Sequence, residues 1–363
     1  MRRSTVVLVT LAATVSPAAA QEPEPERIRP TTVLSEPFSR IRGMRELADG
    51  RLLLADQLEN AVYMADFVAQ TRTQIGRNGA GPEEYNGPIG LYVARADSSW
   101  LVDLSNGRVS VLAPDGRVVR SQPLFSEDRS IPTNADTLGN LYWDDVTAVR
   151  LAKRENPDAD QASIIRLSAT GVIDTLGSLT IPGGVNPTPF WDWDDWAVGR
   201  DGRVVIVRNR EPYRLEFRET DGTHRQGPVT PFEAVRVTAA DREAYAAGNR
   251  TGGGVGGASI GGDGTGGGRP RMPDTDFPDR FPPVRHDRTW VAADGRTWVQ
   301  RHQHLDAEGL VYDVFDRTGT RVARYRLPAD TEVIGFGTRG MYAVRTDEVG
   351  LQWLEIFLIR GGR

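Results

Sequence analysis

The chain has 363 residues, a formal net charge of -5 at pH 7 and no cysteine. A mildly acidic chain lacks the basic footprint that nonspecific nucleic-acid binding requires, so we expect no nucleic-acid partner. The lack of cysteine excludes disulfides, thiolate chemistry and cysteine-ligated metals, so packing alone has to hold the core together.

The N-terminus has the pattern of a secretory signal peptide. Two arginines precede an apolar run at 6–15, which small residues follow up to Ala20. This pattern is typical of a cleaved signal, and the run is too short to span a bilayer comfortably. We predict a signal peptide at 1–20, a Pro/Glu linker at 21–29 and a periplasmic or extracellular protein without a membrane span. An uncleaved anchor is the alternative.

The stretch 75–119 has the pattern of one complete repeat unit. A Gly/Pro-rich lead-in is followed by apolar runs at 89–93, 100–102 and 109–113, separated by turns rich in Gly, Asp and Asn. Short β-branched and aromatic runs between such turns indicate antiparallel strands. Four strands in about 40 residues is the size of a propeller blade.

This stretch resembles the blade of NHL-type six-bladed β-propellers found in secreted bacterial proteins. The resemblance rests on the Gly-Pro lead-in, a strand that ends at Asp103, the turn Asn106-Gly107-Arg108-Val109 and the closing Asp115-Gly116. It implies a fold, whereas the functions of such propellers are too diverse to imply an activity.

Further copies of this turn-and-strand pattern occur along the chain. They lie at 41–75, 131–179, 196–222, 290–327 and 333–359. The last copy lacks a fourth strand, while 31–37 is spare and extended, so we expect the N-terminal strand to complete blade six and close the ring. The sequence therefore predicts an all-β fold, a single six-bladed β-propeller at 30–361.

The segment 230–285 interrupts the repeats between blades four and five. Thr238 precedes an alanine-rich stretch as a helix N-cap, and 251–268 is almost entirely glycine. We expect a partly helical, Gly-rich insertion, whose glycine tract has no side chains to bury.

Strand parity separates the two faces of the predicted disc. The turns between the first two and between the last two strands of each blade share one face, and many are tight, such as Asp49-Gly50 and Asp294-Gly295. The other connections share the opposite face and are long and varied. We call this the elaborated face, and we expect it to carry the function.

The residue that ends the second strand of each blade borders the elaborated face. In chain order these residues are Asp56, Asp103, Asp144, Arg208, Arg301 and Arg345. Three acids followed by three arginines would give the rim a negative and a positive half, suited to a ligand with an anionic group at one end. The alternative is that each residue braces its own blade, which we favour for the acids.

The arginines are the better ligand candidates. Arg208, Arg301 and Arg345 occupy equivalent positions in neighbouring blades. We predict that they converge on the mouth of the central channel and bind an anionic group through charge-assisted hydrogen bonds. The competing hypothesis pairs Arg208 with Glu211 and Arg345 with Asp347.

Aromatic residues enter blade four at the same face. Trp191 and Trp193, in the stretch 190–196, are candidates for stacking on a sugar ring or a cation. The alternative, which we favour, is that both pack under the long insertion, because a tryptophan buries a large apolar area.

The histidines are the candidate metal ligands. His302 and His304 lie two residues apart, on one face of an extended chain, with His286 and Asp306 as further donors. Two imidazoles and a carboxylate suit zinc or iron, but a site needs three or four converging ligands, which the spacing does not settle. The sequence assigns no catalytic residue.

Three hypotheses of function remain. We favour a monomeric, cofactor-free, non-catalytic binding module that holds a protein, peptide, glycan or small anionic ligand on its elaborated face. The second is a metal-assisted propeller enzyme, similar to lactonases or lyases, that uses His286, His302 and His304. The third is a structural component of a larger envelope assembly.

Overall fold

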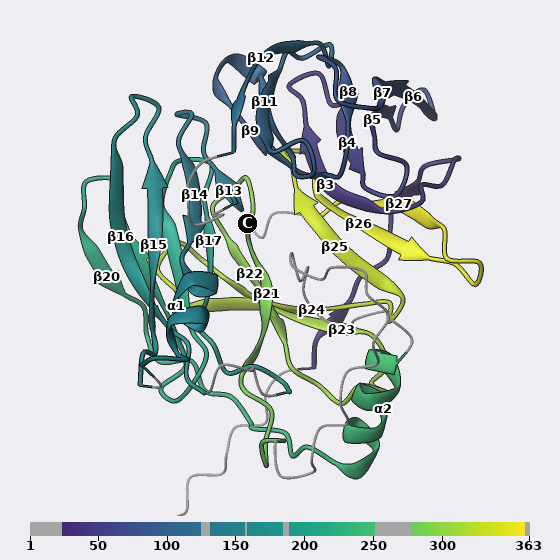
Figure 1. Ribbon diagram of the computed structural model, residues 1–363. Helices are drawn as coiled ribbons and strands as arrows, with labels where there is room; N and C mark the ends of the chain where they lie inside the picture. The colour runs from purple at the N-terminus through teal and green to yellow at the C-terminus, as the bar shows by residue number, and fades with distance from the viewer. Residues whose placement is uncertain (1–23, 125–130, 157, 184–188, 251–276, 360–363) are drawn as a thin grey trace, which may run out of the picture.

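The strands of this protein form a ring of sheets. The structure, a computed structural model, describes residues 24–124, 131–156, 158–183, 189–250 and 277–359. Six sheets of four or five strands surround a central axis (Figure 1). The all-β, six-bladed propeller predicted from the sequence is confirmed.

Blades one to three are antiparallel four-stranded sheets in sequence order. They contain β3 (Ile41–Glu46), β4 (Leu52–Asp56), β5 (Ala61–Asp66) and β6 (Thr71–Ile75); β9 (Pro88–Val93), β10 (Ser99–Asp103), β11 (Arg108–Leu112) and β12 (Val118–Pro123); and β13 (Asn134–Ala135), β14 (Leu141–Asp144), β15 (Gln161–Leu167) and β16 (Ile173–Thr180).

Blades four to six repeat this plan with strands from both ends of the chain. They contain β17 (Asp195–Val198), β18 (Val204–Arg208), β19 (Arg214–Arg218) and β20 (His224–Gln226); β21 (Val284–Val291), β22 (Thr297–Arg301), β23 (Leu310–Phe315) and β24 (Arg321–Leu327), with β1 (Glu26–Arg27) parallel to β24; and β25 (Thr331–Phe336), β26 (Met341–Thr346), β27 (Gln352–Phe357) and β2 (Thr32–Val33).

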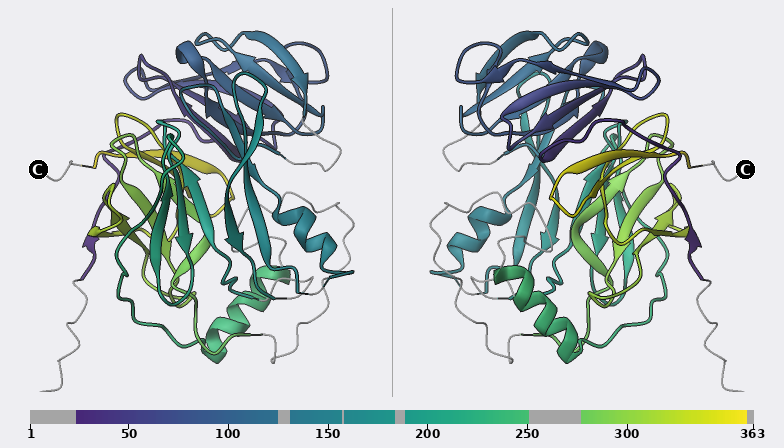
Figure 2. Two further views of the ribbon diagram at one scale, coloured as in Figure 1. Left: turned by 90° about the vertical axis from the view of Figure 1, so that its left-hand side faces the viewer. Right: turned by 90° about the vertical axis from the view of Figure 1, so that its right-hand side faces the viewer.

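Short elements decorate the ring. They are the parallel pair β7 (Arg77–Asn78) and β8 (Glu84–Tyr85), the 3-10 turn η1 (Arg95–Asp97) and the helices α1 (Val146–Ala152) and α2 (Ala239–Arg250). Both helices belong to connections of the elaborated face (Figure 2). None of the helices in the described ranges is long and apolar enough to cross a bilayer.

The first strand of every blade lies nearest the axis. In ring order β3, β9, β13, β17, β21 and β25 contact one another and return to β3. Blades one and two approach most closely at Gly43, where an added Cβ would lie 2.5 Å from the backbone nitrogen of Leu91. Real Cβ atoms do not come that close to backbone, so a side chain at position 43 would push the two blades apart.

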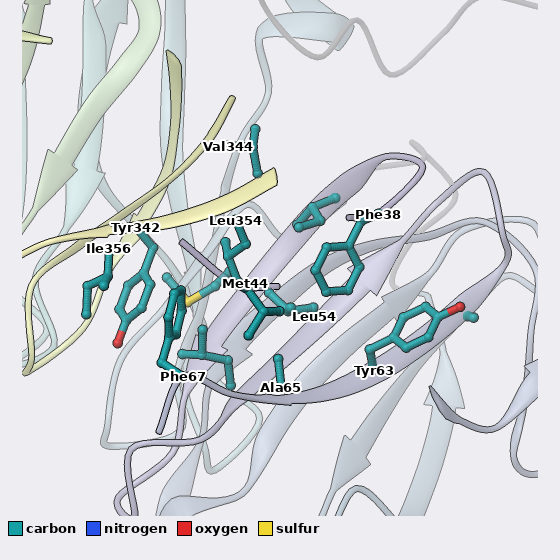
Figure 3. Packing of buried hydrophobic residues seen from close by; sticks show 14 residues of the cluster. Phe38, Met44, Leu54, Tyr63, Ala65, Phe67, Tyr342, Val344, Leu354 and Ile356 are labelled. Atoms are coloured by element: carbon teal, nitrogen blue, oxygen red, sulfur yellow. The ribbon is translucent and has the colours of Figure 1, made fainter. Parts of the chain in front are cut away.

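The N-terminal strand completes blade six, as the sequence predicts. β2 runs antiparallel to β27, with Thr32 opposite Ile356, and Leu34 N donates to Leu354 O at 2.8 Å. Leu34 and Phe38 are each only 1% exposed and pack with residues of blades one and six (Figure 3). The strand therefore joins the last blade to the first.

The described part of the insertion contains the helix α2 between irregular segments. α2 begins at Ala239, directly after the Thr238 N-cap that the sequence indicates. The carboxylate of Asp241 accepts hydrogen bonds from the backbone and hydroxyl of Thr238 at 2.8 and 2.6 Å. The glycine tract at 251–268 and the predicted signal peptide at 1–20 lie outside the described residues.

We predict that Leu34→Ala destabilises the whole propeller, because it leaves a cavity at the seam where the ring closes. Leu34 is buried, so the free energy of unfolding should fall by about 2–5 kcal/mol in a urea titration. Val33→Ala on the same strand is the control, since Val33 is 37% exposed and should change stability by less than about 0.5 kcal/mol. Equal losses in the two variants would show that Leu34 does not hold the seam.

Candidate functional site

A cavity of about 250 Å³ opens on the elaborated face beside blade five. Its apolar wall includes Phe190, Trp191, Tyr245 of α2 and Leu310. Its polar wall is formed by the charged stretch 285–287 of β21 and by the residues that follow β22. A small pocket with apolar walls and a few polar groups is the usual form of a small-molecule site.

The polar wall exists because β21 bulges. Its pairing with β22 shifts register between Val284 and Thr289, and Asp287 lies in the left-handed region with φ 59°. A non-glycine residue in this conformation is strained. Bulges re-aim side chains, and this one presents His286 and Asp287 to the cavity.

The bulge brings three donor side chains together. Asp195, the first residue of β17, meets His286 and Asp287, each with one ligand atom within 4.8 Å of the other two. His286 Nε2 lies 3.2 Å from Asp287 Oδ1, and its Nδ1 lies 3.9 Å from Asp195 Oδ1. Although His286 Nδ1 is buried, it has no hydrogen-bond partner among the described residues. We call Asp195, His286 and Asp287 the donor triad.

Hydrogen bonds fix Asp195 in the triad. Its Oδ2 accepts from the backbone of Arg288 at 3.1 Å and from the hydroxyl of Thr289 at 2.6 Å. Its Oδ1 accepts from the backbone of Trp196 at 2.9 Å. The carboxylate is thus held rigidly across the boundary between blades four and five.

Burial and neighbouring charges shift the pKa values of the groups in this region. Burial raises the pKa of Asp195 and outweighs the opposing charge of His286. Burial also raises the pKa of Asp144, whose Oδ2 accepts from the indole of Trp196 at 2.9 Å. Burial lowers the pKa of His286, but the carboxylates of Asp287 and Asp195 outweigh it and raise the pKa overall. A buried carboxylate, Asp195, close to the exposed carboxylate of Asp287 is an arrangement that a cation would stabilise.

Two tryptophans pack against His286 of the triad. The rings of Trp191 and Trp193 are 4.6 Å apart, and each lies 5.4 Å from the ring of His286. Trp193 is anchored by an indole hydrogen bond to Pro182 O at 3.0 Å. It is Phe190 that packs under the insertion, 5.2 Å from Tyr245 of α2. Among the described residues the tryptophans pack beside blades three and four, and their place under the insertion stays a prediction.

The three histidines proposed as one cluster have separate partners. His304 Nδ1 lies 2.9 Å from Asp241 Oδ2, and the ring of His302 stacks on Phe281 at 5.3 Å. Burial lowers the pKa of His302 to about 3, helped by the charges of Arg285 and Arg301. Within the described ranges the donor triad is the group of three that could hold a metal ion, and of the three histidines it contains His286.

The acids at the strand ends divide into two kinds. Asp103 braces its blade, since its Oδ2 accepts from Arg108 Nε at 3.0 Å as the sequence suggests. Asp56 accepts from the backbone of Ser39 at 2.8 Å, again a local contact. Asp144 differs from them, because it lies close enough for the charges of Asp287 and His286 to shift its pKa.

The arginines at the strand ends are all ion-paired within their own blades. Their contacts are Arg208 with Glu216 at 2.7 Å, Arg301 with Asp313 at 3.1 Å and Arg345 with Glu355 at 3.0 Å. Each acid sits on the third strand, opposite the residue two places before the arginine. Diagonal cross-strand pairs of this kind are common in antiparallel sheets. The sequence suggested that Arg208 pairs with Glu211 and Arg345 with Asp347. In the structure their partners are Glu216 and Glu355 instead.

Arg301 is the strand-end arginine that lines the cavity. Its guanidinium also lies over the rings of Tyr213 and Phe232, at 5.8 and 5.6 Å. A joint anion site of Arg208, Arg301 and Arg345 stays a prediction, and the acid partners of all three already balance part of their charge.

Sequence reasoning missed Asp195, Asp287 and Arg285. The available signal was a charged stretch, Arg285-His286-Asp287-Arg288, in what should be the apolar inner strand of blade five. A second signal was the adjacent acids Asp194-Asp195 at the start of the inner strand of blade four. Charged residues in a strand next to the axis break the binary pattern of a propeller, and such breaks mark functional sites.

Comparisons with known proteins add similarity of fold. No family profile and no curated protein matches this chain. Similar solved structures include the calcium-binding protein regucalcin from Agrobacterium tumefaciens, at 16% identity over 92% of this chain and 95% of that one, with a TM-score of 0.45. Virginiamycin B lyase from Staphylococcus aureus has 12% identity over 91% of this chain and 99% of that one, with a TM-score of 0.43.

A gluconolactonase from Xanthomonas campestris is similar at 11% identity over 92% of this chain and 96% of that one, with a TM-score of 0.43. Identities and TM-scores this low carry no argument about activity, so the function has to be argued from the site. The NHL-type family suggested by the blade sequence is not among the matches, and that assignment stays a prediction.

One carboxylate fixes α2 against the cavity rim. Asp241 accepts from His304 Nδ1 at 2.9 Å and from the backbone of Leu305 at 3.0 Å, which ties the helix to the loop after β22. Burial raises the pKa of Asp241, but the hydrogen bonds from Thr238, His304 and Leu305 outweigh burial and lower it to about 2. The ionised carboxylate therefore stabilises the folded state.

We predict that Asp241→Asn lowers the free energy of unfolding, and that this deficit depends on pH. The stabilisation is complete above the unfolded pKa of about 3.9 and is lost as the pH falls through the folded value. The deficit, measured by urea titration, should therefore shrink between about pH 5 and pH 2. Asp306→Asn, in the same loop but exposed, is the control and should show no deficit. A deficit that is constant over this range would contradict the role of the Asp241 charge.

Proposed function

We propose that this protein is a metal-assisted enzyme that hydrolyses a small ester or lactone in the cavity beside blade five. The observation that carries the proposal is the donor triad, two carboxylates and one imidazole within 4.8 Å of one another. His286 and Asp287 of the triad also line the cavity, so a bound cation would face the substrate.

The residues present fit a divalent cation. Carboxylate oxygens and an imidazole nitrogen are the donors that zinc, manganese and iron accept. His286 Nδ1 is buried without a hydrogen bond, and the strained Asp287 is held where its oxygen lies beside the imidazole. Buried acids with raised pKa values and an orphaned ring nitrogen are more easily explained by a cation than by packing.

Each residue of the site has a role in this proposal. A divalent cation held by the triad would polarise the substrate carbonyl and lower the pKa of a bound water. Asp144 is the candidate general base, because it lies close enough to Asp287 and His286 of the triad for their charges to shift its pKa. Trp191 and Trp193 exclude bulk water from His286 and so strengthen the electrostatic interactions there.

The reaction balances with these groups alone. A C–O bond forms between the water oxygen and the carbonyl carbon, and the C–O bond to the alcohol oxygen breaks. The proton lost by the water passes to the carboxylate of Asp144 and then to the departing alcohol oxygen. The products are a carboxylate and an alcohol, which are parts of one molecule when the substrate is a lactone.

The non-catalytic binding module explains less of the site. A binding surface accounts for the elaborated face and the aromatic wall, but it gives no role to the left-handed Asp287 or to the raised pKa values of Asp195 and Asp144. Strain and perturbed pKa values concentrate at sites of chemistry. We therefore prefer the enzyme to the module.

We predict that the purified protein binds a divalent cation and that Asp287→Asn weakens binding at least about 100-fold, because loss of a direct ligand costs more than loss of an outer partner. Binding of zinc or manganese can be followed by tryptophan fluorescence, since both Trp191 and Trp193 contact His286. Asp192→Asn is the matched control, because Asp192 lies in the same loop as Asp195 but is exposed. Equal affinities for the two variants would remove the triad as a metal site.

The activity is tested with a panel of small esters and lactones. We expect hydrolysis that a chelator abolishes and added metal restores, and that Asp287→Asn loses while Asp192→Asn keeps. We expect Asp144→Asn to bind metal normally and to lower kcat by about 100-fold or more, as for a lost general base. Activity that survives complete removal of metal would overturn the proposal.

A further inference from the structure

Arg285 is a cation of the cavity wall for which the described residues show no ion-pair partner. Arg285 lies on β21 next to His286 and lines the cavity. Within the described part of the chain, no hydrogen bond or ion pair to its guanidinium was found, unlike Arg288, which pairs with Glu332 at 2.9 Å, and Arg301, which pairs with Asp313 at 3.1 Å.

The described groups around Arg285 are engaged with other residues and do not pair with its guanidinium. The nearby Glu332 is already engaged by Arg288. His302, on the same wall, stacks on Phe281 and contributes a neutral ring. Tyr312 is another neighbour that affects the pKa of Arg285, and its hydroxyl donates to Gln300 Oε1 at 3.1 Å. A half-buried guanidinium in the cavity wall, without an ion-pair partner among the described residues, favours a cavity that receives an anion.

We propose that Arg285 binds a carboxylate of the substrate. One unpaired guanidinium balances one negative charge, which favours a singly charged carboxylate over a phosphate dianion. Its planar fork of donors also matches the two oxygens of a carboxylate. The anion site itself stands on the contacts of Arg285, whereas its part in catalysis rests on the proposed function.

The positions of the two groups define the substrate class. Arg285 and Asp287 lie on the same bulged strand and line the same cavity, with opposite charges. A molecule whose carboxylate binds Arg285 would therefore extend its ester or lactone carbonyl toward the donor triad. Phe190 and Trp191 form an aromatic wall along the space between Arg285 and the donor triad. The substrate is thus a small ester or lactone that carries a free carboxylate, held at both ends.

The anion site is tested by titrating acetate and benzoate against their neutral isosteres, acetamide and benzamide. The titrations are made in the presence of a chelator and followed by fluorescence, since Trp191 lines the cavity. We expect at least one carboxylate to bind at least tenfold more tightly than its amide. Arg285→Gln should weaken that carboxylate about 10- to 100-fold and leave the amide unchanged.

Two further variants make the result specific. Arg285→Lys keeps the charge but loses the planar fork, so it should bind the carboxylate with an affinity between those of the wild type and Arg285→Gln. Arg296→Gln is the control, because Arg296 pairs with Asp294 at 2.6 Å in a tight turn of the opposite face, and it should behave as wild type.

Three results would overturn the inference. They are equal binding of carboxylates and amides, unchanged carboxylate affinity in Arg285→Gln, and tighter binding of inorganic phosphate than of either carboxylate. Because the titrations contain a chelator, failure of the metal site would leave them unchanged. Conversely, loss of the anion site would leave the metal titration of the wild type unchanged, so the two proposals fail separately.

Discussion

Closure of the ring is the constraint on which the rest of the structure depends. The antiparallel pairing of β2 with β27 gives blade six its outer strand and buries Leu34 and Phe38 at the seam with blade one. In a closed ring every blade is packed between two neighbouring blades, so the six inner strands are fixed around the axis. Only then do β17 and β21, from segments far apart in the sequence, stay in contact at the site.

Much of the fold could be predicted because its signals are local. Strand runs, tight turns and the bracing of Asp103 by Arg108 lie within a few residues of one another. The site could not be predicted in the same way, since Asp195 meets a bulge some 93 residues away, at Arg288, and a bulge changes which way each side chain points. The charged inner strand was visible in the sequence, but its geometry was not.

The ion pairs of the strand-end arginines show a second limit of sequence analysis. Partners for Arg208 and Arg345 were sought in the nearest loop, whereas Glu216, Asp313 and Glu355 all lie diagonally across the hairpin. That relation repeats in three blades and follows from strand register, which hairpin length sets. The rim arginines of blades four to six are thus ion-paired within their own blades, and the charges of the site that we propose lie on β17 and β21 instead.

Charged residues of the inner strands β17, β21 and β3, together with the rim residue Asp144, include both signs in neighbouring blades. Asp144, Asp195 and Asp287 come from blades three, four and five, and burial raises the pKa of the first two. In blades five and one, burial and neighbouring positive charge lower the pKa values of Arg285 and Arg42. Arg285 and Asp287 lie two residues apart on the bulged β21, and both line the cavity. In the function that we propose, this arrangement would let one small cavity hold a cation and a carboxylate at the same time.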